Sequence, residues 1–224
     1  MDQNVLKNVK QSEYECKWKT VIEYFNVQTS DLDPRHNFDY RQGGLPEQDS
    51  RGSEPYYLPI GWYRHGLKVD NKYAGDNVWL GHVNAEGEWP VVFHGTNEGA
   101  VLGITQQGLL ASKFTRDLMR AEAVKLIGAE ADHQGIYLAT HCNEGADAYA
   151  GEFSLPISTG KSETFQVVFQ CRVQPGKFTR HTIPVLTGEA WRFIDERAIR
   201  PYGILLKEVI LPEKDDSIAN LVNP

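Results

Sequence analysis

The chain has 224 residues, a formal net charge of −7 and an isoelectric point near 5.5. Hydrophobic residues make up 41% and charged residues 24%, which is ordinary globular composition and enough for one domain with a substantial core. No run of lysine and arginine occurs, so a surface that tracks nucleic acid is disfavoured, although a local basic pocket for one pyrophosphate is compatible with the charge.

Features of the whole chain indicate its compartment. Three widely spaced cysteines, Cys16, Cys142 and Cys171, imply no disulfide framework. The first residues contain no apolar signal segment, no stretch is long enough to span a membrane, and no Asn-x-Ser/Thr acceptor occurs. We therefore predict an intracellular protein, cytoplasmic or nuclear, without a membrane partner.

The first predicted element is an amphipathic helix over residues 13–25, expected as an N-terminal helical arm packed alongside the main domain. Its apolar residues recur at helical spacing: Tyr14, Trp18, Val21, Ile22 and Phe25.

A polar stretch over 28–54, dominated by Gly, Pro, Asp and Ser, follows this helix. It predicts a long loop or linker that is either mobile or wrapped over the core. The sequence thus divides into a helix and polar linker (1–54), a main domain (55–212) and a polar tail (213–224).

The main domain is predicted to contain more strands than helices. Apolar runs predict strands at 89–93, 135–139, 165–173 and 202–211, and periodic segments predict helices at 97–108 and 116–127. Irregular, glycine-rich connections separate the strands. Together these features predict an α+β fold with a sheet-dominated core and few helices.

The most informative segment is VVFHGT, in which an apolar strand leads directly into His94, Gly95 and Thr96. A histidine at the end of a buried strand has a fixed ring position. Gly95 has no Cβ, so a flat ligand can approach its backbone and pair a planar amide with its N–H and C=O.

A second segment supplies two aromatic rings. Tyr137 lies on the predicted strand GIYLA, and Tyr149 follows after a loop of small residues. Two tyrosines on a strand and the loop after it can hold a flat aromatic ring between them.

These motifs in this order, over about half of the chain, resemble the catalytic domain of the poly(ADP-ribose) polymerase class of ADP-ribosyltransferases. The resemblance implies a split two-sheet α+β fold with NAD as substrate. It implies that His94 binds the adenine-side ribose and that Gly95 binds the nicotinamide carboxamide, with Thr96 completing the motif. Tyr137 and Tyr149 would flank the nicotinamide ring.

The sequence departs from this family where polymer-forming members carry a late-strand glutamate, because Pro201 stands there. Glu196, with Asp195 beside it, is the nearest candidate acid for stabilising positive charge on the ribose. A position that often carries serine near the nicotinamide is Ala146. These departures argue against polymer elongation. Three alternatives stay open: mono-ADP-ribosyl transfer, NAD hydrolysis, and binding without a reaction.

The segment GWYRHGLKV contributes Arg64, whose planar guanidinium suits the NAD pyrophosphate. No metal site is predicted, since His133, His141 and Cys142 match no usual zinc spacing. The leading hypothesis is a NAD-dependent mono-ADP-ribosyltransferase with a macromolecular acceptor, protein before nucleic acid. The alternative is a catalytically inactive module that binds NAD, ADP-ribose, a nucleotide or a protein.

Overall fold

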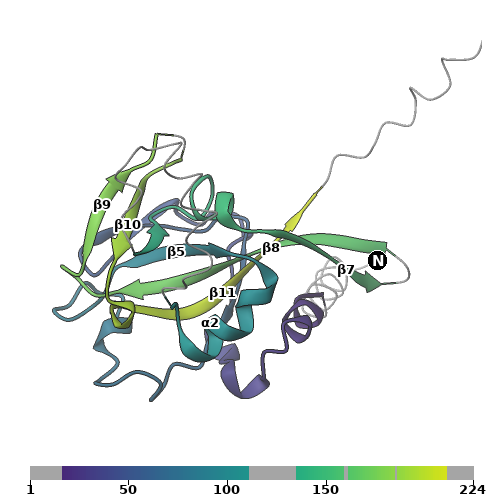
Figure 1. Cartoon of the computed structure of the whole chain (residues 1–224), viewed down its shortest axis with the longest axis horizontal. Helices are drawn as coiled ribbons and strands as arrows, with labels where there is room; N and C mark the ends of the chain where they lie inside the picture. Colours follow the sequence, from purple (N-terminus) through teal and green to yellow (C-terminus); the bar gives the residue numbers. More distant parts are fainter. Residues whose placement is uncertain (1–16, 111–134, 159–160, 185, 211–224) are drawn as a thin grey trace, which may run out of the picture.

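The computed structural model describes residues 17–110, 135–158, 161–184 and 186–210. Most of its strands form one nine-stranded sheet of order β1-β4-β11-β8-β5-β6-β10-β9, with β7 paired to β8 (Figure 1). The paired strands are antiparallel, and β2 and β3 form a separate hairpin. A mostly antiparallel sheet with few helices is compatible with the predicted α+β class.

The bounds of the elements are as follows. The strands are β1 (Phe38–Asp39), β2 (Gln48–Arg51), β3 (Glu54–Tyr57), β4 (Tyr63–Gly66), β5 (Val91–Thr96), β6 (Ile136–Ala139), β7 (Glu152–Ser158), β8 (Lys161–Val173), β9 (Phe178–Thr182), β10 (Glu189–Phe193) and β11 (Ile199–Val209). The helical elements are residues 17–24, α2 (Val101–Gln107) and the 3₁₀ turns η1 (Thr29–Asp31), η2 (Pro34–His36), η3 (Val78–Leu80), η4 (Glu98–Ala100), η6 (Ala146–Tyr149) and η7 (Glu196–Ala198).

The predicted strands are present with shifted ends as β5, β6, β8 and β11, and the predicted helix at 97–108 is η4 followed by α2. The predicted helix at 116–127 lies outside the described residues. The longest strands, β8 and β11, pair from Ile199↔Val173 to Val209↔Thr164. Their register shifts between Pro201 and Gly203, and a bulge is a place where a strand tolerates a proline that has no N–H to donate.

The sheet carries a hydrophobic core on each face, because side chains alternate along every strand. Ile204 and Phe169 are level with each other across β11 and β8 and belong to the first core, with the apolar residues of α2. Their chain neighbours Leu205 and Val168 belong to the second core, with Trp62. The β9–β10 hairpin and β7 lie toward opposite ends of the sheet in Figure 1.

The described N-terminal helical residues, 17–24, are part of the first core. Trp18 is buried and stacks on Tyr63 with ring centroids 5.7 Å apart, and Val21 and Phe25 are also buried. A separate N-terminal helical arm, as expected from the sequence, is therefore not evident in the described part of the chain.

The segment 28–54 is wrapped over the core, one of the two arrangements that its sequence allowed. It contains β1, which pairs with β4, and β2, which pairs with β3. Tyr40 is buried in the second core, where its hydroxyl lies 3.0 Å from that of Tyr56. Because the segment is mainly polar in composition, its few buried side chains could not be recognised from the sequence.

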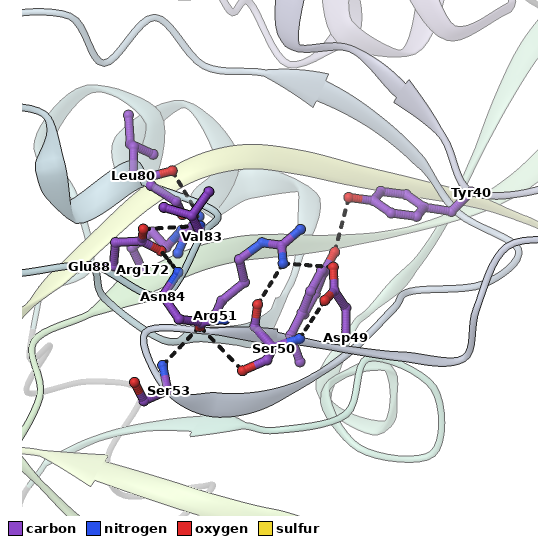
Figure 2. Close-up of polar contacts among 12 residues, drawn as sticks. Tyr40, Asp49, Ser50, Arg51, Ser53, Leu80, Val83, Asn84, Glu88 and Arg172 are labelled. Carbon is purple, nitrogen blue, oxygen red and sulfur yellow. Dashed lines mark hydrogen bonds and ion pairs between the residues drawn. The ribbon is translucent and has the colours of Figure 1, made fainter. Parts of the chain in front are cut away.

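A loop over residues 81–88 is built around the buried carboxylate of Glu88, which accepts hydrogen bonds from the backbone N–H groups of Val83, Asn84 and Ala85 at 2.9–3.0 Å (Figure 2). Burial raises the pKa of Glu88, but these three N–H groups outweigh it and the pKa is lowered. Asn84 in turn accepts from the backbone N–H of Ser53, which joins the loop to the β2–β3 hairpin. The carboxylate of Glu88 thus organises structure here.

Candidate functional site

His94 and Gly95 lie on β5, at the point where β5 separates from β6. Within the described residues β5 and β6 share one register pair, Phe93↔Ala139, whereas β5 pairs with β8 from Val91 to Thr96. The strand edge beyond Phe93 that faces β6 is therefore free of a regular strand partner in the described structure. This is the only join between described strands of the large sheet that rests on a single pair.

The turn η6 packs directly against Gly95. A Cβ built on Gly95 would lie 1.9 Å from the carbonyl oxygen of Ala146 and 3.0 Å from the backbone nitrogen of Ala150. Only glycine permits this approach of η6, whereas the sequence predicted the approach of a flat ligand at this position. Thr96 is buried beside it, and its carbonyl oxygen accepts from the N–H of Gly151 at 3.1 Å.

The structure brings the two predicted tyrosines to the region of His94 and Gly95 on two different elements, β6 and η6. Tyr137 lies on β6, and its carbonyl oxygen is 3.2 Å from Nδ1 of His94. Tyr149 ends η6 next to Ala150, and its side chain is 43% exposed. His94, Gly95, Thr96, Tyr137 and Tyr149 therefore lie around the separation of β5 and β6.

The protonation of His94 follows from its contacts. Burial lowers its pKa, and the Tyr137 carbonyl partly opposes this by favouring the charged ring. A carbonyl oxygen can only accept, so Nδ1 carries the proton and donates to it. Nε2 of the neutral ring then has a lone pair, which makes it an acceptor suited to a hydroxyl group.

Glu196 is placed elsewhere. It begins η7 and is exposed, directly before β11, whose first residue Ile199 pairs with Val173 of β8. His94 pairs with Phe169, which lies four residues from Val173 along β8. At the usual rise of a strand, the pairs Ile199–Val173 and His94–Phe169 are therefore about 13 Å apart. The neighbouring Asp195 is held by Arg197, with Nε 2.9 Å from Oδ1.

Arg64 shares a sheet face with Gly95 but lies three strands away. Leu205 pairs with Arg64 and with Val168, and Val168 pairs with Gly95, so the separation is about 14 Å at the usual strand spacing. The buried Leu205 and Val168 lie between them.

The guanidinium of Arg64 is engaged within the protein. It donates to the carbonyl oxygen of His36, the hydroxyl of Tyr40 and the side-chain oxygen of Gln170 at 3.0–3.2 Å. The structure thus places Arg64 in a polar network of the second core, apart from the candidate site.

Pro201 is buried near the start of β11, and its carbonyl oxygen accepts from the hydroxyl of Tyr73 at 3.1 Å. Its neighbour Arg200 lies over the Trp89 ring, 4.3 Å from the ring centroid, and over Trp79. The start of β11 is thereby tied to the loop before β5.

Sequence reasoning missed the residues that support η6. Trp62 donates from Nε1 to the side-chain oxygen of Asn143 at 2.8 Å, and Asn143 donates to the carbonyl oxygen of Ile60 at 2.9 Å. Nζ of Lys207 lies 4.0 Å from the carboxylate of Asp147, within η6. No local pattern signals these contacts, because they join segments far apart in the chain.

In the described segments, no three His, Cys, Asp or Glu side chains gather where a metal ion would bind. Nor does this part of the chain contain a helix long and apolar enough to cross a membrane. In comparisons with known proteins, no family model matches this chain, and no curated protein sequence matches it significantly.

Proposed function

We propose that this protein binds NAD where β5 and β6 separate and transfers one ADP-ribosyl group to a macromolecular acceptor. A protein acceptor is favoured over a nucleic acid. The observation that carries the proposal is the strand edge at Gly95, which lies directly against η6 and, among the described residues, has no register pair with β6 past Phe93. A backbone edge of this kind can pair with the carboxamide of nicotinamide. The proposal also rests on the resemblance of the His94, Tyr137 and Tyr149 motifs to the ADP-ribosyltransferase family.

Each residue has a chemical task in this proposal. Nε2 of His94 accepts a hydrogen bond from a ribose hydroxyl, as the tautomer set by Tyr137 requires. The rings of Tyr137 and Tyr149 lie on either side of the nicotinamide and exclude water from it. These contacts fix the leaving group and the ribose relative to each other.

Few charged groups are needed because of how the bond breaks. Nicotinamide departs as a neutral molecule from a cationic precursor, so no general acid has to protonate it. Positive charge then grows at the anomeric carbon, as it does in glycoside cleavage. With Pro201 where polymer-forming relatives carry glutamate, we propose transfer of a single unit without elongation.

Nicotinamide release from NAD, measured with the purified protein and a cell lysate as acceptor, tests this proposal. We expect His94→Ala and Tyr137→Ala to lower the rate at least tenfold, since each removes a contact that orients the reacting groups. His82→Ala, at an exposed histidine in the loop before β5, is the matched control and should keep the rate. Equal rates in all four proteins would reject the assigned site.

A second candidate function is binding without turnover. It is favoured by the placement of Glu196 in η7, because the first register pair after η7, Ile199↔Val173, lies about 13 Å along β8 from that of His94, and by the proline at position 201. Calorimetry with ADP-ribose distinguishes the two functions. Heat of binding that His94→Ala abolishes, together with no nicotinamide release from the wild type, would establish the binding module.

A further inference from the structure

A small pocket of about 180 Å³ lies beside the β9–β10 hairpin, between β3 and the residues that follow β6. It is separate from the candidate NAD site, although the loop after β6 borders both. Its walls are formed by Glu54, Pro55, Tyr57, Thr140, His141, Arg180, Gly188, Glu189 and Trp191. This volume suits one amino-acid side chain rather than a whole cofactor, for which pockets of 300 Å³ or more are usual.

The pocket carries two carboxylates and one guanidinium. Nη2 of Arg180 donates to Oε1 of Glu54, and Nη1 lies 3.4 Å from Oε2 of Glu189. A single arginine thus bridges both acids, and one negative charge remains. Burial lowers the pKa of His141, so that ring adds no compensating positive charge at neutral pH.

Flat aromatic groups complete the walls. The guanidinium carbon of Arg180 lies 4.9 Å from the centroid of the Trp191 ring. Tyr57 and His141, both in the wall of the pocket, stack with centroids 3.8 Å apart. Two carboxylates beside aromatic rings are groups that recognise a guanidinium, through paired charge-assisted hydrogen bonds and cation–π contacts.

Glu189 and the indole of Trp191 do not depend on Arg180 for their positions. Nε1 of Trp191 donates to Oε2 of Glu189 at 2.9 Å, and Trp191 itself is buried and stacked on Phe178. Arg180, in contrast, lies on the edge strand β9 with its side chain 46% exposed. The side chain of Arg180 can therefore leave the two carboxylates by rotamer changes while Glu189 and Trp191 keep their positions.

We propose that this pocket binds an arginine side chain of a partner protein and that Arg180 occupies the two carboxylates until the partner arrives. Arginine fits better than lysine, because its planar fork matches two carboxylates and the flat walls. An arginine within a peptide fits better than free arginine, because free arginine would add an α-carboxylate to a pocket that already carries a net negative charge. This inference does not depend on the proposed NAD chemistry.

The test is a titration of the full-length protein with N-acetyl-arginine methylamide, followed by NMR through the indole N–H of Trp191. The neutral citrulline counterpart and free arginine are titrated in parallel. The variants are Arg180→Ala, which removes the side chain that occupies the two carboxylates, and Glu54→Gln, which removes one acid. Arg192→Ala is the control, because Arg192 follows Trp191 on β10 and its side chain therefore points to the opposite sheet face.

We expect the arginine probe to bind the wild type and to bind Arg180→Ala about tenfold more tightly, because the internal competitor is gone. Glu54→Gln should weaken binding about tenfold through loss of a charge-assisted hydrogen bond, and Arg192→Ala should bind as the wild type does. If the probe bound Arg180→Ala but not the wild type, it would only be filling the space left by the removed side chain, and the proposal would be overturned. Equal binding of the citrulline probe, or tighter binding of free arginine, would also overturn it.

Discussion

Replacing Gly95 with alanine is expected to lower the free energy of unfolding by about 3 kcal/mol, the upper end of the range for over-packed cores. The added Cβ would lie 1.9 Å from the Ala146 carbonyl oxygen, which is a backbone atom and cannot rotate away. η6 must therefore move off β5 and carry Tyr149 with it. Urea denaturation of the variant measures the loss, and the exposure of Tyr149 to chemical modification reports the displacement.

Gly103→Ala is the matched control for this substitution. Gly103 lies within α2, and a Cβ there meets nothing within 4 Å. Alanine is the better helix former by about 0.5–1 kcal/mol, so this variant should be slightly more stable than the wild type. If Gly95→Ala were as stable as the wild type, η6 would not lie against Gly95, and the packing on which the proposed NAD site depends would be wrong.

The second large effect expected is a loss of stability in acid caused by His65. This side chain lies buried on β4, with its ring centroid 5.0 Å from that of Tyr63, and no hydrogen-bond partner for its Nε2 is found among the described residues. Burial lowers the pKa of His65 from 6.5 to about 4. The unfolded chain therefore takes up a proton near pH 6.5, while the folded protein resists doing so until about pH 4.

Between these two pH values the unfolded state binds more protons, so the free energy of unfolding falls as the pH falls. At about 1.4 kcal/mol per pKa unit, His65 accounts for a loss of roughly 3 kcal/mol between pH 7 and pH 4. Urea denaturation at pH 7, 5.5 and 4 measures it. His65→Leu should flatten this dependence, whereas His82→Ala, at an exposed histidine, should retain the wild-type dependence. An unchanged slope in His65→Leu would show that other groups cause the acid sensitivity.

Much of the framework could be predicted locally. The apolar runs that form β5, β6, β8 and β11 could be recognised in the sequence, because strands have a characteristic residue composition and are bounded by turn residues. Gly95 was predicted to allow the close approach of a flat ligand; in the structure the backbone of Ala146 lies close to it, and the approach of a ligand stays a prediction. Both features leave a mark within a few residues of chain.

Other features left no such mark. The segment 28–54 has the composition of a linker, yet Tyr40 anchors it in the second core through Tyr56 and Arg64. A few buried side chains among many polar ones do not shift a compositional average. The assignment of Arg64 to a pyrophosphate likewise rested on its residue type, whereas its contacts to His36, Tyr40 and Gln170 depend on strands brought together by folding.

The sequence alone determined the sheet-dominated class, the strand that ends in His94 and Gly95, and the strand and loop that carry Tyr137 and Tyr149, because hydrophobic periodicity and glycine punctuation are local properties. Tertiary structure alone decided that β5 and β6 join at a single pair, that η6 rests on Gly95, and that Arg180 lies between Glu54 and Glu189. These arrangements bring together residues from separate parts of the chain. Packing and charge pairing across such separations are set by the fold as a whole, and no segment encodes them by itself.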